Sequence, residues 1–182
     1  MIVRSIILSI FSMVILSGNA QMTIVLDRVP QLTPLLDELY YSGTYNNWNR
    51  GDWQTVFEKK DGVYSLTIMA EENSKQEFYV NRGNDETNAS KADGSYIDPF
   101  VFTYKKGQTL HFSIEGWRDM PGKHTVTKNV FILSNHFEMD SLNRHRRIWI
   151  CLPNDYTSGE KTYPVIYLQD GQNLFDQASA FM

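Results

Sequence analysis

Short segments of alternating apolar and polar residues run from residue 22 to about residue 119, and they restrict the fold more than any other feature. Turn residues interrupt the alternation at intervals of about ten residues, which is typical of an all-β sandwich. Residues 30–34 are a predicted loop, because their prolines cannot donate to a strand ladder. The sequence therefore predicts a mainly β module over 21–119, with strands at 23–29, 38–43, 54–58, 63–69, 76–81, 100–104 and 109–115.

Alternation also predicts which side chains face the core of this module. The turns at residues 60–62 and 105–107 place glycine where a hairpin requires a positive φ. Residues 81–98 are mostly polar and are predicted to form a long surface loop. The predicted core residues are Tyr64, Leu66, Ile68, Phe78, Val80, Leu110, Phe112 and Ile114.

Residues 1–20 have the composition of a secretory signal peptide. A basic start with Arg4 precedes an apolar run over residues 6–16, and small residues follow up to Ala20. The apolar run is too short to cross a bilayer, which needs about 20 residues. We therefore expect cleavage before Gln21 and a secreted or periplasmic protein without a membrane anchor.

Charge and cysteine content exclude several classes of function. With 17 basic and 21 acidic residues, the chain is a poor partner for nucleic acid. The basic cluster at 144–147 is interpreted as a solvated strand entry rather than a polyanion site. The lone Cys151 cannot form an intramolecular disulfide and is expected to pack as a small apolar side chain. The four histidines lack metal-ligand spacing, so no metal and no cofactor are predicted.

The pattern changes after Trp117. Residues 120–127 are predicted to be a linker, and strand-like runs follow at 129–137, 146–152 and 164–169. The last run is continuously apolar, as expected for a strand buried on both faces of a parallel sheet. Three strands without a covering helix do not close such a core. Residues 128–182 are therefore expected to be the first part of a larger, truncated domain.

The densest aromatic cluster lies at residues 40–53. Sugars stack their C–H faces on aromatic rings, while amides and hydroxyls bond the ring oxygens. Asn46, Asn47 and Asn49 lie beside Trp48, and Trp53 follows. A carbohydrate-binding surface is one interpretation. In the other, the two tryptophans plug one end of the sandwich.

Residues 41–48, together with 60–64 and 76–80, resemble the glycogen- and starch-binding β-sandwich modules, including that of the AMP-activated protein kinase β subunit. The resemblance covers roughly residues 38–83. It implies an immunoglobulin-like sandwich in which Trp48 stacks on a glucan. Asn47 and Trp53, from the same aromatic cluster, are further candidate contacts. The second stacking tryptophan of that family is replaced here by the turn at 82–85. Weak binding, or a rigid spacer without binding, is therefore also consistent with the sequence.

Residues 142–156 and 161–176 resemble the opening of an esterase family of α/β hydrolases that includes esterase D, feruloyl esterases and acetylxylan esterases. An arginine-rich strand, a Leu-Pro-x-x-Tyr turn and a Pro-Val run ending in Asp-Gly occur in the family's order. The resemblance implies the start of an α/β-hydrolase sheet. It also implies that the backbone amide of Gln172, after a bend at Gly171, is one of two oxyanion-hole donors. The alternative is a plain strand-to-loop turn.

A serine hydrolase of this fold also needs a Gly-x-Ser-x-Gly elbow, an acid and a histidine, in that order along the chain. These 182 residues contain no such elbow, so we expect no ester hydrolysis from them alone. The resemblance implies the front of a serine carboxylic ester hydrolase that acts on a carbohydrate ester without metal or cofactor, and the signal peptide predicts that this enzyme is secreted. A non-catalytic glycan-binding module is the alternative.

Overall fold

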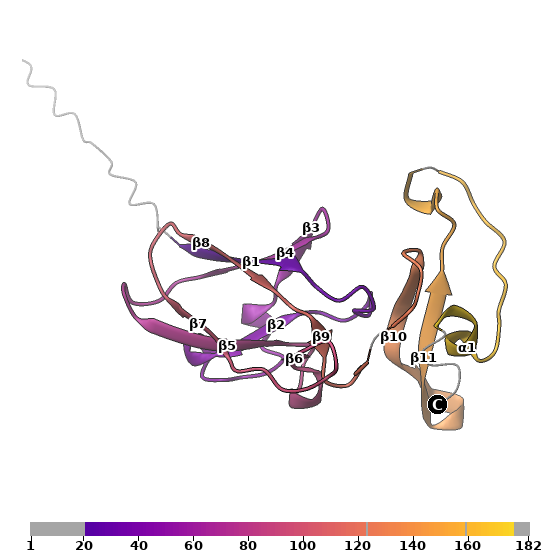
Figure 1. The fold of residues 1–182 in the computed structure, drawn as a ribbon, viewed down its shortest axis with the longest axis horizontal. Coiled ribbons are helices and arrows are strands. Elements are labelled where there is room, and N and C mark those ends of the chain that lie inside the picture. The colour runs from indigo at the N-terminus through magenta and orange to yellow at the C-terminus, as the bar shows by residue number, and fades with distance from the viewer. Residues whose placement is uncertain (1–20, 123, 159, 177–182) are drawn as a thin grey trace, which may run out of the picture.

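The computed structural model describes residues 21–122, 124–158 and 160–176 (Figure 1). The predicted signal peptide at residues 1–20 lies outside these ranges. No helix in the described ranges is long and apolar enough to cross a membrane. The strands of the first module are β1 (Met22–Arg28), β2 (Tyr40–Gly43), β3 (Glu58–Lys60), β4 (Val63–Ile68), β5 (Lys75–Asn81), β6 (Ala89–Ser90), β7 (Phe100–Thr103), β8 (Thr109–Ser113) and β9 (Gly116–Trp117).

Two sheets face each other in this first module, which confirms the predicted sandwich (Figure 1). One sheet has the order β3-β4-β1-β8, in which β1 is antiparallel to β4 and parallel to β8. The other has the order β2-β5-β7, with antiparallel pairing throughout. The short pair β6-β9 lies at the end of the sandwich that faces the second module.

The core between the two sheets confirms most of the predicted inward faces. Tyr64, Leu66 and Ile68 on β4 are buried, and Phe78 and Val80 on β5 are fully buried. Ile114 is also buried, but it follows the end of β8. Leu110 and Phe112 stay partly buried, because β8 is an edge strand with one neighbour.

The predicted strand at 54–58 is wrong. The 3-10 helix η2 (Trp53–Thr55) occupies its first half, and β3 begins only at Glu58. The side chain of Asp52 caps η2 by accepting a hydrogen bond of 3.1 Å from the amide of Gln54. A side-chain cap of this kind satisfies a free backbone donor and favours the helical turn over an extended strand.

The predicted surface loop at 81–98 is wrong in its first half. Asn81, Arg82 and residues 87–90 are buried, and residues 85–87 form the 3-10 helix η3 (Asp85–Thr87). The polar side chains are buried because they bond the local backbone. Asn81 accepts from the amide of Gly83 at 2.8 Å, and Thr87 accepts from the amide of Arg82 at 3.1 Å.

The second module begins with a hairpin of β10 (Val130–Met139) and β11 (Arg144–Cys151), joined through η4 (Asp140–Leu142). η5 (Tyr156–Ser158) and α1 (Gly171–Phe175) follow. Cys151 is exposed rather than packed in a core, and the side-chain amide of Asn129 donates to its sulfur at 3.4 Å.

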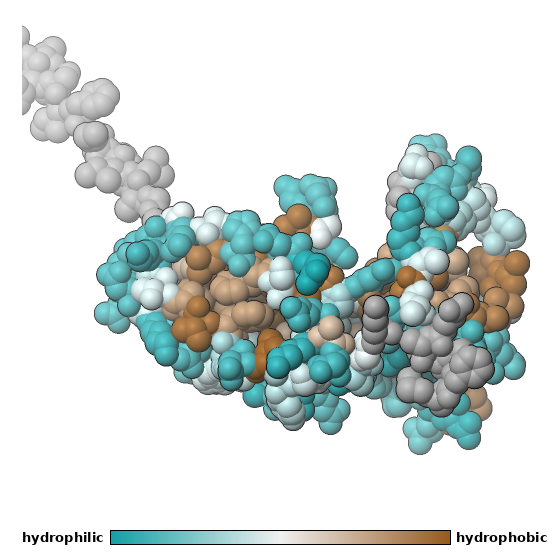
Figure 2. All heavy atoms as spheres, in the orientation of Figure 1, coloured by the Kyte–Doolittle hydropathy of each residue, from teal (hydrophilic) through white to brown (hydrophobic). Residues whose placement is uncertain are grey.

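The predicted strand at 164–169 is wrong, because this segment has no regular secondary structure. A continuously apolar strand is stable where both of its faces are covered, and within the described residues no strand pairs with this segment. Residues 165–168 are 58–91% exposed, and apolar spheres gather at this edge of the molecule in Figure 2. Of the predicted α/β sheet, the described residues form only the hairpin.

The hairpin packs directly on the sandwich. The amide of Leu35 donates to the carbonyl of Ile132 at 2.8 Å, and the amide of Leu36 donates to that of Leu133 at 3.2 Å. Ile132 is fully buried and belongs to the same hydrophobic cluster as the sandwich core. The predicted linker at 120–127 therefore joins two parts that share main-chain hydrogen bonds and apolar contacts.

Arg82 is a buried cation at this end of the sandwich. Its side chain is 1% exposed, and Nη1 donates to Asp37 at 2.6 Å while Nη2 pairs with Asp119. The guanidinium carbon also lies 5.1 Å from the ring centre of Trp117. Three segments that are distant in sequence are thus held by one side chain.

We predict that Arg82→Met lowers the free energy of unfolding by about 3 kcal/mol, because it leaves the two carboxylates without their buried partner. Urea denaturation followed by circular dichroism measures this loss. Arg50→Met, which removes an exposed ion pair with Asp85, is the matched control and should cost less than about 1 kcal/mol. Equal losses in the two variants would contradict the assignment.

Candidate functional site

Asn46 organises the loop that carries Trp48. Its Nδ2 donates to the carbonyls of Tyr41 at 2.9 Å and Asn49 at 2.8 Å, and its Oδ1 accepts from the amide of Gly43 at 2.9 Å. The amide group of Asn46 is therefore used inside the loop. Asn46 therefore does not offer a sugar the free amide that the carbohydrate-binding interpretation assigned to it.

Asn47 and Trp48 follow in left-handed backbone conformations, with φ of 54° and 59°. The amide of Trp48 donates to the carbonyl of Gly43 at 2.8 Å, which closes the loop. Asn47 is exposed, and Trp48 is half-buried with its ring centre 6.0 Å from that of Tyr79. Trp48 thus presents part of its ring to solvent beside a second aromatic ring. Contact of Asn47 and Trp48 with a glycan stays a prediction.

Tyr79 is a candidate that the sequence interpretation missed. It alternates with the buried Phe78 and Val80 on β5, so period-two alternation already placed it on the outer face. Burial raises the pKa of its hydroxyl, and the charge of Asp98 raises it further.

Trp53 is 79% exposed at the start of η2. It therefore does not plug the end of the sandwich, and that interpretation of Trp53 is wrong. No ring contact joins Trp53 to Trp48 within the described residues. A glycan contact at Trp53 stays a prediction.

The bend before Gln172 lies at Asp170, not at Gly171 as predicted. Asp170 has a φ of 53°, whereas Gly171 is the first residue of α1. Aspartate adopts the left-handed region more readily than most residues, which explains why glycine is not required for the bend. A Cβ on Gly171 would lie 3.6 Å from side-chain atoms of Trp149 and Phe175, an ordinary van der Waals contact, so the packing of α1 on β11 does not require glycine either.

The amide of Gln172 lies in the first turn of α1, where backbone N–H groups have no partner within the helix. Within the described residues, this amide takes part in no strand ladder and has no hydrogen-bond acceptor. The carbonyl of the same residue accepts from the amide of Asp176 at 2.9 Å. The oxyanion role of Gln172 stays a prediction.

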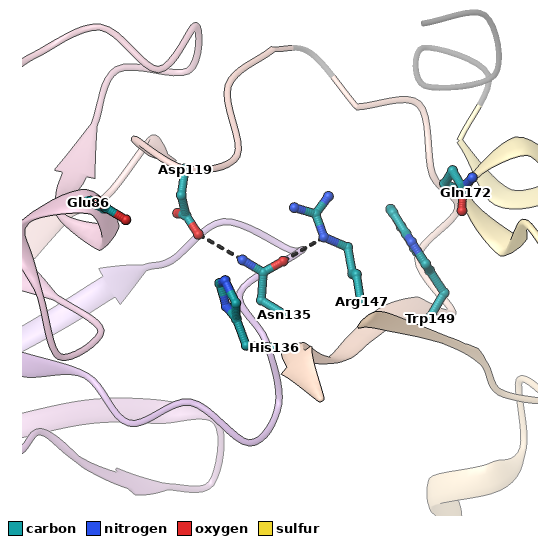
Figure 3. Close-up of a pocket in the computed structure, with 7 residues that line it drawn as sticks. All are labelled: Glu86, Asp119, Asn135, His136, Arg147, Trp149 and Gln172. Atoms are coloured by element: carbon teal, nitrogen blue, oxygen red, sulfur yellow. Dashed lines mark hydrogen bonds between the residues drawn. The ribbon is translucent and has the colours of Figure 1, made fainter. Parts of the chain in front are cut away.

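A cavity of about 410 Å³ lies between the two modules, and Gln172 forms part of its wall (Figure 3). A hydrogen-bonded row crosses it, in which Asn135 donates to Asp119 at 2.8 Å and Arg147 Nε donates to Asn135 at 2.6 Å. Burial lowers the pKa of the Arg147 guanidinium, and the charge of Asp119 opposes this shift. The cavity is lined by Glu86, Asp119, Asn135, His136, Arg147, Trp149 and Gln172.

Asp176 fastens the end of α1 to the segment between the modules. Its carboxylate is fully buried and lies 2.6 Å from Nδ1 of His124. The amide and hydroxyl of Thr125 also donate to it, at 2.9 and 3.0 Å. These bonds hold the end of α1, and with it the turn that carries Gln172, to residues 124–125. No motif in the sequence predicted them.

Comparison with known proteins bears most directly on the family resemblance of the second module. Residues 139–182 match the family model described as "Putative esterase", and the match spans β11 and α1. The chain is also 28% identical over 109 residues to an alpha-amylase from Niallia circulans. That similarity covers 58% of this chain but 8% of the amylase, so the chain spans a small part of its relative's length. The resemblance to the esterase family is thus confirmed over residues 139–182.

Proposed function

We propose that this chain belongs to a secreted carboxylic ester hydrolase that works by serine acyl transfer on a carbohydrate ester. One observation carries the proposal. The Asp-Gly-Gln turn of the esterase-like segment lies on the wall of a cavity, and the amide of Gln172 is outside any ladder in the described residues.

The amide of Gln172 would act on the charge that develops during acyl transfer. When a serine attacks an ester carbonyl, the carbonyl oxygen becomes negative, and backbone N–H donors stabilise it. One such donor contributes about 3 kcal/mol to the transition state. The 182 residues contain no Gly-x-Ser-x-Gly motif, so the proposal assigns them an oxyanion donor and part of the substrate surface.

The carbohydrate part of the proposal rests on the first module. Trp48 and Tyr79 form an outward pair of rings on the sandwich, and the chain is similar to a protein named alpha-amylase. Aromatic rings of this kind suit the C–H face of a sugar. The same pair favours the second candidate function, a glycan-binding module without catalysis.

We predict that Gln172→Pro lowers kcat by about 10²–10³-fold in the enzyme encoded by the complete reading frame, because proline removes one oxyanion donor. Gln172→Ala keeps the N–H and should leave kcat within about threefold of the wild type. Hydrolysis of p-nitrophenyl acetate measures both. Proline is tolerated in the first turn of a helix, so thermal unfolding should show both variants folded.

The proposal fails if the reading frame encodes no Gly-x-Ser-x-Gly elbow after Met182. It also fails if the proline and alanine variants lose the same activity, because the loss would then come from the side chain and not from the amide.

We predict that Trp48→Ala abolishes retention of the chain on insoluble starch or xylan, because the part of the ring that faces solvent supplies the stacking face. Affinity electrophoresis in gels with soluble glucan or xylan gives the dissociation constant. Tyr167→Ala removes a ring that is 91% exposed on the second module and is the matched control. Unchanged retention of Trp48→Ala would show that Trp48 does not contact the glycan. The same experiment on Trp53→Ala tests a contact at Trp53.

A further inference from the structure

Two groups of opposite charge face the cavity between the modules without neutralising each other. The carboxylate of Glu86 has no ion-pair or hydrogen-bond partner among the described residues. Arg147 uses Nε to bond Asn135, while its two outer nitrogens have no partner there. Asp119 also lines the cavity, but Arg82 and Asn135 already satisfy its carboxylate.

Trp149 adds an apolar face to the same cavity. Its side chain lies between those of Arg147 and Gln172 in Figure 3. The ring is partly buried against the hydrophobic core, which holds it in place. A ligand in the cavity would thus meet one flat aromatic surface, free guanidinium donors and a free carboxylate acceptor.

This set of groups fits a polyhydroxyl ring better than a simple ion. A hydroxyl both donates and accepts, so one ring can bond Arg147 and Glu86 together while a C–H face lies on Trp149. A small anion would pair with Arg147 but would face two carboxylates, and a cation would meet the guanidinium. The volume of about 410 Å³ lies within the range of small-ligand sites.

We propose that the cavity binds a neutral pyranose ring, at a site formed by both modules and separate from Trp48. The inference rests on the proposed function in one respect, since Gln172 belongs to both sites and the ring would be the sugar part of the ester substrate. Arg147 and Glu86 bind the ring hydroxyls, and Trp149 stacks on its face.

Asn135 is a positioning residue in this site. It donates to Asp119 and accepts from Nε of Arg147, which leaves the outer nitrogens of the guanidinium directed to the cavity. Asp119 is itself held by the buried Arg82. The sandwich therefore supplies two residues to the site: Glu86, which contacts the ligand, and Asp119, which orients Arg147 through Asn135.

Titration of the 182-residue chain with methyl β-D-glucopyranoside tests the site. Nuclear magnetic resonance follows the indole N–H of Trp149 and Nε–H of Arg147, and we expect both signals to shift and saturate. Arg147→Gln and Glu86→Gln should each raise the dissociation constant about tenfold, since each removes a charged hydrogen-bond partner. Asn135→Ala should weaken binding less and should broaden or shift the Arg147 signal without ligand.

Arg146→Gln is the matched control. Arg146 precedes Arg147 on β11 but does not line the cavity, and its guanidinium donates to the carbonyl of His145 at 3.0 Å. Its substitution, and Trp48→Ala, should leave the titration unchanged. Equal effects of Arg146→Gln and Arg147→Gln, or the absence of a saturable shift, would overturn the inference.

Sodium acetate is the second probe. Acetate that shifts the same signals at the same concentration as the glucoside would show a simple anion site and overturn the sugar assignment. Failure of this inference can also be distinguished from failure of the esterase proposal. Sugar binding without hydrolysis by the complete enzyme would overturn only that proposal, and hydrolysis without sugar binding would overturn only this inference.

Discussion

The buried guanidinium of Arg82 is the interaction on which the arrangement of this protein depends. A desolvated cation needs partners, and Arg82 has carboxylates on two sides, from Asp37 and Asp119. Asp119 in turn accepts a hydrogen bond from Asn135, and Asn135 accepts one from Arg147. A charge buried in the sandwich thereby determines where a side chain of the second module points.

The sandwich is consequently part of the candidate site rather than a detached spacer. Main-chain hydrogen bonds join residues 35 and 36 to the first strand of the second module, and Ile132 completes the sandwich core. The cavity between the modules has walls from both. A glycan-binding surface at Trp48 and a sugar site at this cavity would serve different parts of one carbohydrate ligand.

The sequence predicted the fold well wherever burial was one-sided. Strands with one buried face have a period of two, so Leu66 and Phe78 could be assigned to the core from alternation alone. The strands predicted at 54–58 and 164–169 are absent, because apolar content does not distinguish a strand from a capped helical turn or from an extended segment without a partner strand. Asp52 caps a helical turn in the first segment, and no described strand pairs with the second.

The sequence by itself determined the sandwich and the esterase-like segment that contains the turn at Gln172. Each of these is a local pattern, read within a few residues of the chain. Only the tertiary structure decided that Asn46 serves the loop, that the bend lies at Asp170, and that Glu86 faces Arg147 and Trp149 across a cavity. The reason is physical. A side chain's role is set by which donors and acceptors reach it in space, and those partners come from segments that the chain brings together only on folding.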